Sequence, residues 1–164
     1  MPVWTYARRR FAGIVVALLA AIAPASGSSE LKFTAADGGG APRSLSELRG
    51  ALHAVVVWKA SCAPCFDELA HLKEIAAGAP GWRFVTLALD DARTVAETLP
   101  AGAREVGEAW IARDEPTTVL ARLNPDQPAL PLTIAVDRRG RICARRVGLL
   151  GSDILNGWSA QCSK

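Results

Sequence analysis

Hydrophobic residues in the first half of the chain follow the order strand, helix, strand, helix. An apolar, β-branched run predicts a buried strand over residues 53–59, and apolar positions then recur at helical spacing over residues 65–77. A second apolar run predicts a buried strand over residues 83–89, and a helix that ends near residue 99 follows it. This succession is typical of a βαβ unit.

The pattern continues on both sides of this unit. Upstream, residues 31–34 are expected to form a short edge strand. Downstream, we expect helices over residues 103–113 and 116–123, a β-hairpin over residues 132–147 and a final helix over residues 152–162. The sequence contains no repeat and no second domain boundary, so it predicts one α/β domain.

The N-terminal segment differs in composition from the rest. Three arginines at residues 8–10 precede an apolar stretch over residues 11–23, and small residues follow. This order is typical of a secretory signal peptide, and the apolar stretch is short for a membrane span. We therefore expect residues 1–25 to be a signal peptide and residues 26–164 to form the exported domain. An uncleaved anchor at residues 11–23 is the alternative.

The basic charge of the chain belongs to that segment. The sequence has 19 Lys and Arg against 16 Asp and Glu, and three of the arginines are residues 8–10, which leaves 16 of each sign afterwards. No basic stripe with interleaved aromatic residues remains, so a nucleic-acid partner is not expected. Export also favours disulfides among the four cysteines, because oxidising compartments preserve them.

A Cys-x-Pro-Cys motif lies between the first predicted strand and helix. At a helix N-terminus the unpaired N–H groups and the helix dipole favour a thiolate, so Cys62 is expected to be the nucleophile. Cys65, one turn later, is the expected resolving thiol, and Pro64 falls where the helix needs no N–H donor. The motif predicts a redox site; a permanently closed bridge is the alternative.

With these elements in this order, residues 31–162 resemble the thioredoxin fold, and more narrowly the TlpA/ResA/DsbE-type exported thiol-disulfide oxidoreductases. The chain is similar to them in the cysteine motif, in the 66 positions from Cys65 to Pro131, and in a Leu-x-x-Leu-x-Gly lead that begins at Leu45. The resemblance implies a central mixed β-sheet flanked by helices. It also implies an N-terminal extension and a helical insert between the active-site helix and the hairpin.

The resemblance assigns Pro131 the position of the family's cis-proline, which faces the two cysteines. Such a proline presents the preceding backbone, here Leu130, to an extended substrate and discourages metal binding. The implied substrate groove consists of five residues around the motif: Trp58, Ser61, Ala63, Pro64 and Leu130. No cofactor and no metal are expected.

Three features depart from the family pattern. Val56 stands where thioredoxin has a buried acid, so that position supplies no proton acceptor. Ser61 replaces the usual tryptophan before the first cysteine. The family's acid in the central insert has no clear counterpart, and its candidates are Asp90, Asp91 and Glu97.

Other polar residues near the motif are expected to have structural roles. Asp67 and Glu68 are expected only to complement the first turn of the active-site helix. His53 and His71 are expected at a strand end or on the surface, with no catalytic role. Lys59 either lowers the thiol pKa or is simply solvated.

Two further cysteines form a second pair. Cys143 lies in the second hairpin strand and Cys162 near the end of the final helix, which is expected to pack across that sheet. A structural disulfide between them would stabilise the fold by about 3 kcal/mol; two free core thiols are the alternative. Zinc is disfavoured, because these two cysteines are widely spaced in the sequence.

Together these features predict an extracytoplasmic, periplasmic-type oxidoreductase. The resemblance implies that it reduces disulfides of specific exported proteins, as in cytochrome or metal-centre maturation, through Cys62 and Cys65. Its expected partners are such a substrate and a membrane thiol donor that re-reduces it, with membrane contact only through the signal or anchor. The alternatives are a copper-handling protein whose dithiol holds Cu(I) and a redox-inert interaction module.

Overall fold

The computed structural model describes residue 1 and residues 33–163 of the chain. Apart from Met1, the predicted signal or anchor lies outside these residues. No helix of the described part is long and apolar enough to cross a membrane. The elements, in chain order, are β1 (Ala35–Asp37), β2 (Pro42–Arg43), the 3₁₀ helix η1 (Leu45–Glu47), β3 (Leu52–Trp58), α1 (Ala63–Ala70), α2 (Leu72–Ala77), β4 (Trp82–Ala88), α3 (Ala92–Thr98), α4 (Ala101–Val106), β5 (Gly107–Ala112), α5 (Pro116–Leu123), β6 (Leu132–Val136), β7 (Ile142–Val147) and α6 (Ser152–Cys162).

The strands form one mixed sheet in the order β2-β1-β5-β4-β3-β6-β7. The central strand β3 runs parallel to β4 and antiparallel to β6. β5 is parallel to β4, whereas β1 pairs antiparallel with both β5 and β2, and β7 pairs antiparallel with β6. The predicted mixed sheet is confirmed, and its parallel part is the βαβ unit around the cysteine motif.

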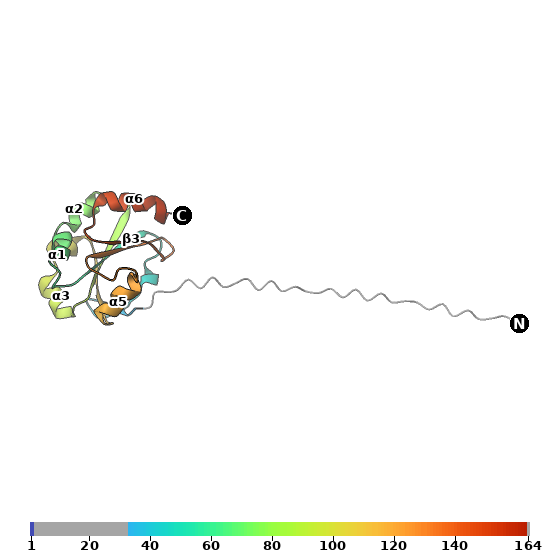
Figure 1. Ribbon diagram of the computed structural model, residues 1–164, viewed down its shortest axis with the longest axis horizontal. Helices are drawn as coiled ribbons and strands as arrows, with labels where there is room; N and C mark the ends of the chain where they lie inside the picture. The colour runs from blue at the N-terminus through green and yellow to red at the C-terminus, as the bar shows by residue number, and fades with distance from the viewer. Residues whose placement is uncertain (2–32, 164) are drawn as a thin grey trace.

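Helices cover both faces of this sheet, and in Figure 1 α2 and α6 lie on the opposite side of β3 from α5. Alternate side chains of a strand point to opposite faces. Ala54, Val56 and Trp58 therefore pack towards α1, α2 and α6. Val55 and Val57 pack towards α5 and η1. Every residue of β3 is buried for this reason, which explains why its sequence is apolar at every position except His53.

The predicted hairpin is confirmed as β6 and β7. Asp137 closes its turn: Oδ1 accepts hydrogen bonds from the backbone N–H groups of Arg139 and Arg141, at 2.8 and 2.9 Å. Gly140 has φ = +79°, a value that an L side chain would strain. The predicted helices over residues 116–123 and 152–162 are present with those bounds.

The helix expected over residues 103–113 is wrong. The chain forms α4 and then turns at Gly107 into strand β5, which lies between β4 and β1. A Cβ at Gly107 would lie 2.1 Å from the carbonyl oxygen of Phe84, so only glycine permits this approach of the two strands. Neighbouring strands on both sides outweigh the helical preference of the local residues.

Two smaller boundaries also differ from the prediction. The edge strand expected over residues 31–34 begins at Ala35 instead, and residues 31–32 lie outside the described residues. The expected helix over residues 65–77 is interrupted at His71, which ends α1 and begins α2.

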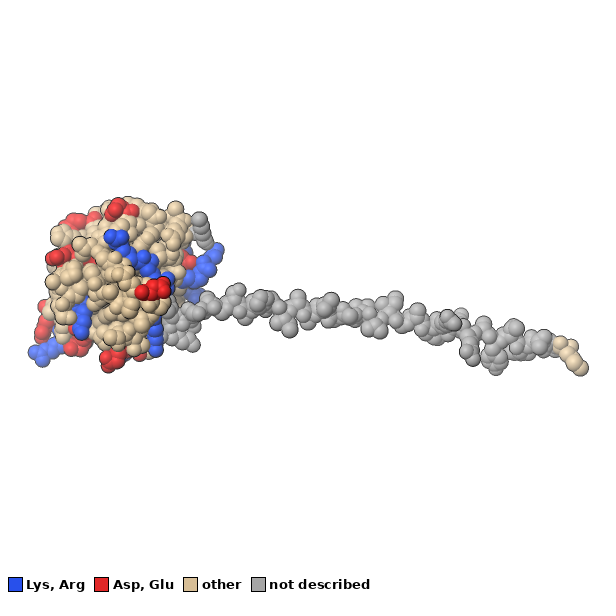
Figure 2. All heavy atoms as spheres, viewed as in Figure 1, with Lys and Arg blue, Asp and Glu red and all other residues tan. Residues whose placement is uncertain are grey.

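Acidic and basic side chains are interspersed on the face seen in Figure 2.

Candidate active site

The cysteine motif lies at the junction between β3 and α1, as the sequence predicts. Cys62 is the N-cap of α1, and its Sγ accepts a hydrogen bond from the Cys65 N–H at 3.3 Å. The two sulfurs form a disulfide with a Cα–Cα distance of 5.3 Å. Cys62 is partly exposed, whereas Cys65 is fully buried. An attacking group can therefore reach only Cys62, the sulfur that the helix N-terminus favours as a thiolate.

Pro131 lies at the same end of the sheet as the cysteines. Leu132, the next residue, pairs with Val57 on β3, only five positions before Cys62. The Leu130–Pro131 peptide bond is cis, and the Pro131 carbonyl accepts a hydrogen bond from the Gly148 N–H at 2.9 Å. Pro131 is buried and Leu130 is half-buried. The topology thus brings together the two cysteines and the proline that the resemblance singled out.

The predicted rim of the site needs one correction. Ser61, Ala63 and Pro64 are exposed, so they are accessible to a partner. Trp58 is not, because its side chain is fully buried and packs edge-on against Phe66, with ring centroids 5.8 Å apart. The strand alternation of β3 directs it into the core, so Trp58 is not part of the accessible rim in this structure.

One acid, predicted only to complement the dipole of the active-site helix, lies inside the core. Glu68 is only 3% exposed. Its Oε1 accepts hydrogen bonds from Thr133 Oγ1 at 3.3 Å and the Leu150 N–H at 3.2 Å, whereas Oε2 is buried without a hydrogen-bond partner. Burial raises the pKa of Glu68 to about 7, although these two hydrogen bonds and the charge of Arg146 oppose the shift.

The position of Glu68 relative to the site is set by helical geometry. Cys65 and Glu68 are three residues apart on α1, so they are neighbours on one helix face. Leu69, also on α1, and Leu72, the first residue of α2, are fully buried next to them in the sequence pattern. The sequence contained a signal for the burial of Glu68, because a glutamate at this position of the apolar stripe faces the core.

The three acids proposed for the insert have different surroundings. Asp90 Oδ2 accepts a hydrogen bond from the Ala60 N–H at 2.6 Å, within the turn that leads to Cys62. Asp91 instead caps α3 by accepting from the Thr94 N–H. Glu97 forms an exposed ion pair with Arg93. Only Asp90 is hydrogen-bonded to the cysteine loop.

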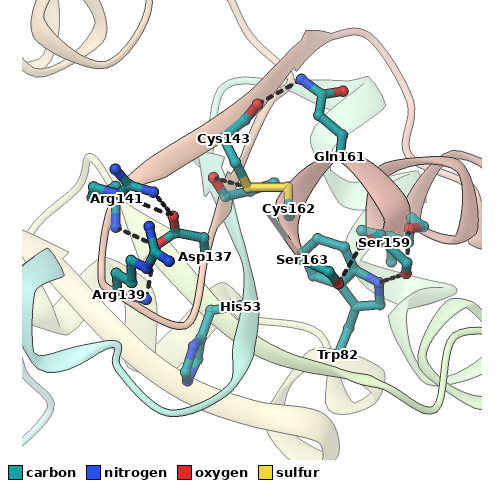
Figure 3. The surroundings of a disulfide bond; sticks show 12 residues. His53, Trp82, Asp137, Arg139, Arg141, Cys143, Ser159, Gln161, Cys162 and Ser163 are labelled. Carbon is teal, nitrogen blue, oxygen red and sulfur yellow. Dashed lines mark hydrogen bonds and ion pairs between the residues drawn. A yellow bond between two sulfur atoms is a disulfide. The ribbon is translucent and has the colours of Figure 1, made fainter.

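The second cysteine pair lies away from this site, between the hairpin and the end of α6 (Figure 3). Cys143 and Cys162 are joined by a disulfide with a Cα–Cα distance of 5.4 Å. The pairing of β6 with β7 shifts register here, since Ala135 pairs with Ala144 and Val136 with Ile142. Cys143 is the extra residue of this bulge, which lets its side chain join Ala144 on the α6 side.

The loop after β7 presents an exposed leucine beside the site. Leu149 is 52% exposed and is, Met1 aside, the one exposed large hydrophobic residue of the described chain. The Gly148 N–H bonds to the Pro131 carbonyl, Arg146 Nε bonds to the Leu149 carbonyl at 2.8 Å, and the Leu150 N–H bonds to Glu68. These bonds hold Leu149 next to the proline.

Neither histidine belongs to the site. His53 is buried, which lowers its pKa, and its Nδ1 lies 3.2 Å from the Ala51 carbonyl oxygen. His71 is exposed at the break between α1 and α2. Within residues 33–163, no group of three or more His, Cys, Asp or Glu side chains is arranged to hold a metal ion.

Comparison with known proteins gives matches in structure alone. No family model matches the sequence, and no curated protein matches it. A secreted Mycobacterium tuberculosis disulfide oxidoreductase homologous to E. coli DsbE matches with a TM-score of 0.59 and 23% identity, over 81% of this chain and 98% of that one. The fold is that of thioredoxin.

Two further structures share this thioredoxin fold. A thio-disulfide isomerase from Thermus thermophilus matches with a TM-score of 0.60 and 22% identity, over 80% of this chain and 93% of its own. A thioredoxin-related protein from Neisseria meningitidis serogroup B matches with a TM-score of 0.61 and 19% identity, over 75% of this chain and 93% of that one. The thioredoxin fold expected from the sequence is thus confirmed.

Proposed function

We propose that this protein is an extracytoplasmic thiol-disulfide oxidoreductase that reduces disulfides of exported proteins through Cys62 and Cys65. One observation carries the proposal: a partly exposed Cys62 caps α1 and is bonded to a fully buried Cys65. This arrangement gives one accessible nucleophile and one protected resolving thiol. Disulfide exchange through a mixed disulfide uses one thiol in each of these two roles.

The proposed reaction proceeds in two exchanges. In the reduced protein, the Cys62 thiolate attacks one sulfur of a substrate disulfide, and the other substrate sulfur leaves as a thiolate that takes up a proton. Cys65 then loses its proton and attacks Cys62 Sγ, which releases the second substrate thiolate. Two electrons pass to the substrate, and the protein is left with the Cys62–Cys65 disulfide.

Glu68 is the proton acceptor that we propose for Cys65. It lies one helical turn from Cys65. Its buried Oε2 has no hydrogen-bond partner, so it has an acceptor site free for a proton. A pKa of about 7 lets a carboxylate accept a proton near neutral pH and release it again. Glu68 thus supplies the base that Val56 cannot.

The partners follow from the accessible surface and the chain's N-terminus. Ala63, Pro64 and Leu149 are exposed around Cys62, and they suit an extended polypeptide with an apolar side chain near its disulfide. Residues 1–25 support export as a signal peptide or anchor, and a dithiol protein of the membrane would restore the reduced state. A maturation role for cytochromes or metal centres is the substrate class that the resemblance favours.

Trapping the mixed disulfide tests this proposal. In a Cys65→Ser variant, Cys62 cannot be released from a bound partner, so full-length protein expressed with its own N-terminus should carry a discrete, reductant-sensitive adduct. A Cys62→Ser/Cys65→Ser double variant is the matched control and should carry none. The proposal fails if the single variant traps no more than the control. Stoichiometric Cu(I) binding by the wild type would then favour the copper-handling alternative.

A further inference from the structure

The loop that carries Cys62 is tied to the neighbouring strand by a carboxylate. Asp90 follows β4, which pairs with β3 up to Trp58 and Ala88. Beyond that pair, the Leu89 N–H donates to the Trp58 carbonyl at 2.9 Å. Asp90 therefore lies beside the turn into α1, and its Oδ2 accepts the Ala60 N–H at 2.6 Å.

The geometry of the turn explains why this bond matters. The Cys62 N–H donates to the Lys59 carbonyl at 2.9 Å, which closes a tight turn over residues 59–62. The Ala60 N–H lies within this turn, in a half-buried stretch, and needs an acceptor. Asp90 supplies it. Among the hydrogen bonds of residues 33–163, it is the single one that a side-chain carboxylate makes to the turn.

We propose that Asp90 is a positioning residue of the redox site, whose carboxylate fixes the turn that presents Cys62 and whose negative charge favours the disulfide over the dithiol. This inference rests on the proposed function and supplies a physical cause for its reducing direction. A negative charge close to Cys62 destabilises its thiolate, so the reduced protein gives up electrons more readily. The site is thereby set as a reductant.

The charge acts at short range. Ala60 and Cys62 are two residues apart, so their Cα atoms are separated by no more than about 7 Å. Asp90 is half-buried, which limits screening by solvent and salt. Its effect adds to the helix N-terminus and to the other charged groups on elements around the site, which are Lys59, Asp67, Glu68, Asp91 and Arg146. Replacing Asp90 alone isolates its share.

Three variants of the full chain separate charge from hydrogen bonding. Asp90→Asn keeps an acceptor oxygen but removes the charge, whereas Asp90→Ala removes both. Asp91→Asn is the matched control, because it removes a charge from the next residue, which caps α3 and does not touch the turn. The readouts are the equilibrium constant of the Cys62/Cys65 couple against glutathione and the pH titration of the Cys62 thiolate.

We expect Asp90→Asn to shift the equilibrium about three- to tenfold towards the dithiol, which corresponds to about 15–30 mV. The Cys62 thiol pKa should fall, while the melting temperature stays close to that of the wild type. Asp90→Ala should show the same shift with a lower melting temperature. Asp91→Asn should change the equilibrium less than about twofold, since its charge is more exposed. An unchanged or more reducing couple in Asp90→Asn overturns the inference.

Failure of this inference is distinguishable from failure of the proposed function. The Asp90→Asn exchange is introduced into the Cys65→Ser variant, and partner trapping is repeated. If trapping persists while the Asp90→Asn potential matches the wild type, the oxidoreductase proposal stands and the role of Asp90 is wrong. If Cys65→Ser traps nothing with Asp90 intact, the proposed function itself fails.

Discussion

The two disulfides of this protein have nearly equal Cα separations, 5.3 Å and 5.4 Å, but opposite surroundings. Cys62 lies at the start of a helix, where N–H groups and the dipole stabilise a thiolate. Cys162 lies at the end of α6, where carbonyl groups disfavour one, and it is 4% exposed. Each bridge joins one partly exposed cysteine, Cys62 or Cys143, to one buried partner. We therefore expect reactivity to depend on which helix end holds the sulfur, and not on the span of the bridge.

The neighbouring groups sharpen this contrast. The first pair has a buried acid, Glu68, one turn away and a carboxylate, Asp90, on its turn. The second pair is surrounded by structural bonds: Gln161 Nε2 donates to the Cys143 carbonyl at 2.7 Å. This bond satisfies an acceptor on the edge strand β7. The second bridge thus joins α6 to the sheet edge, whereas the first lies at the start of α1, beside two acidic side chains.

The largest expected effect comes from removing the proposed nucleophile. Cys62→Ser should lower the rate of insulin or model-disulfide reduction on the order of a thousandfold or more, because serine cannot form the mixed disulfide. A Cys143→Ala/Cys162→Ala double variant should keep the wild-type rate at a temperature where it is folded. Comparable losses in both proteins would erase the functional difference between the two bridges.

The free energy of unfolding should depend more on the Cys143–Cys162 bridge than on the Cys62–Cys65 bridge. The Cys143→Ala/Cys162→Ala variant should lose about 3 kcal/mol of unfolding free energy, since a bridge over a separation of 19 residues restrains the unfolded chain. Denaturant titration measures this loss. The Cys62–Cys65 bridge spans only three residues, so its removal should cost less on the same chain-entropy argument. An equal or larger loss there would contradict the structural assignment.

Glu68 gives a prediction in pH. Its pKa is raised from 4.5 to about 7, so the stability that the neutral acid provides is complete below pH 4.5 and is lost as the pH rises through about 7. Glu68→Gln removes this dependence, and it should be more stable than the wild type by about 2–3 kcal/mol at pH 8 and by much less at pH 4.

Kinetics separate this effect on stability from a role in proton transfer. Glu68→Gln should slow release of the mixed disulfide about tenfold or more at pH 7 and flatten its pH profile. Glu74→Gln, an exposed acid on α2, is the control and should change neither property. A wild-type pH profile in Glu68→Gln would show that Cys65 delivers its proton elsewhere.

The smallest effect concerns the rim. Leu149→Ser should raise the KM for a protein substrate about tenfold, because an apolar contact worth roughly 1–2 kcal/mol is lost on binding. Reduction of a small soluble disulfide should be unaffected by Leu149→Ser. The separate variant Leu149→Met should keep the wild-type KM for the protein substrate, because methionine retains the apolar contact. Equal effects on both substrates would place Leu149 in the fold and not in recognition.

Most of the fold was predictable from local patterns, and the exceptions have physical causes. β3 and the hairpin carry their own signals, an apolar run and an Asp-x-x-Gly turn. β5 does not: its strand state comes from β4 and β1 on either side, and from a close approach at Gly107 that the sequence does not reveal. Non-local pairing of this kind overrides helical propensity.

The site was predictable for the cysteines and not for their supporting groups. A Cys-x-Pro-Cys motif is local in the sequence, so its four residues alone predict disulfide exchange. Glu68 is hydrogen-bonded to Thr133 and Leu150, which are 65 and 82 positions away in the sequence. Asp90 is hydrogen-bonded to Ala60, which is 30 positions away. Such contacts exist only after the sheet assembles. Trp58 failed as a rim residue for the same reason, because the assembled sheet and α1 enclose it.

The most direct test of the account measures both bridges in one titration. The full-length wild type is equilibrated in glutathione buffers of graded potential, alkylated and digested, and the four cysteines are quantified by mass spectrometry. We expect Cys62 and Cys65 to become labelled together at potentials where Cys143 and Cys162 stay protected. Labelling of all four at one potential, or of Cys143 and Cys162 first, would contradict the division between a redox bridge and a structural one.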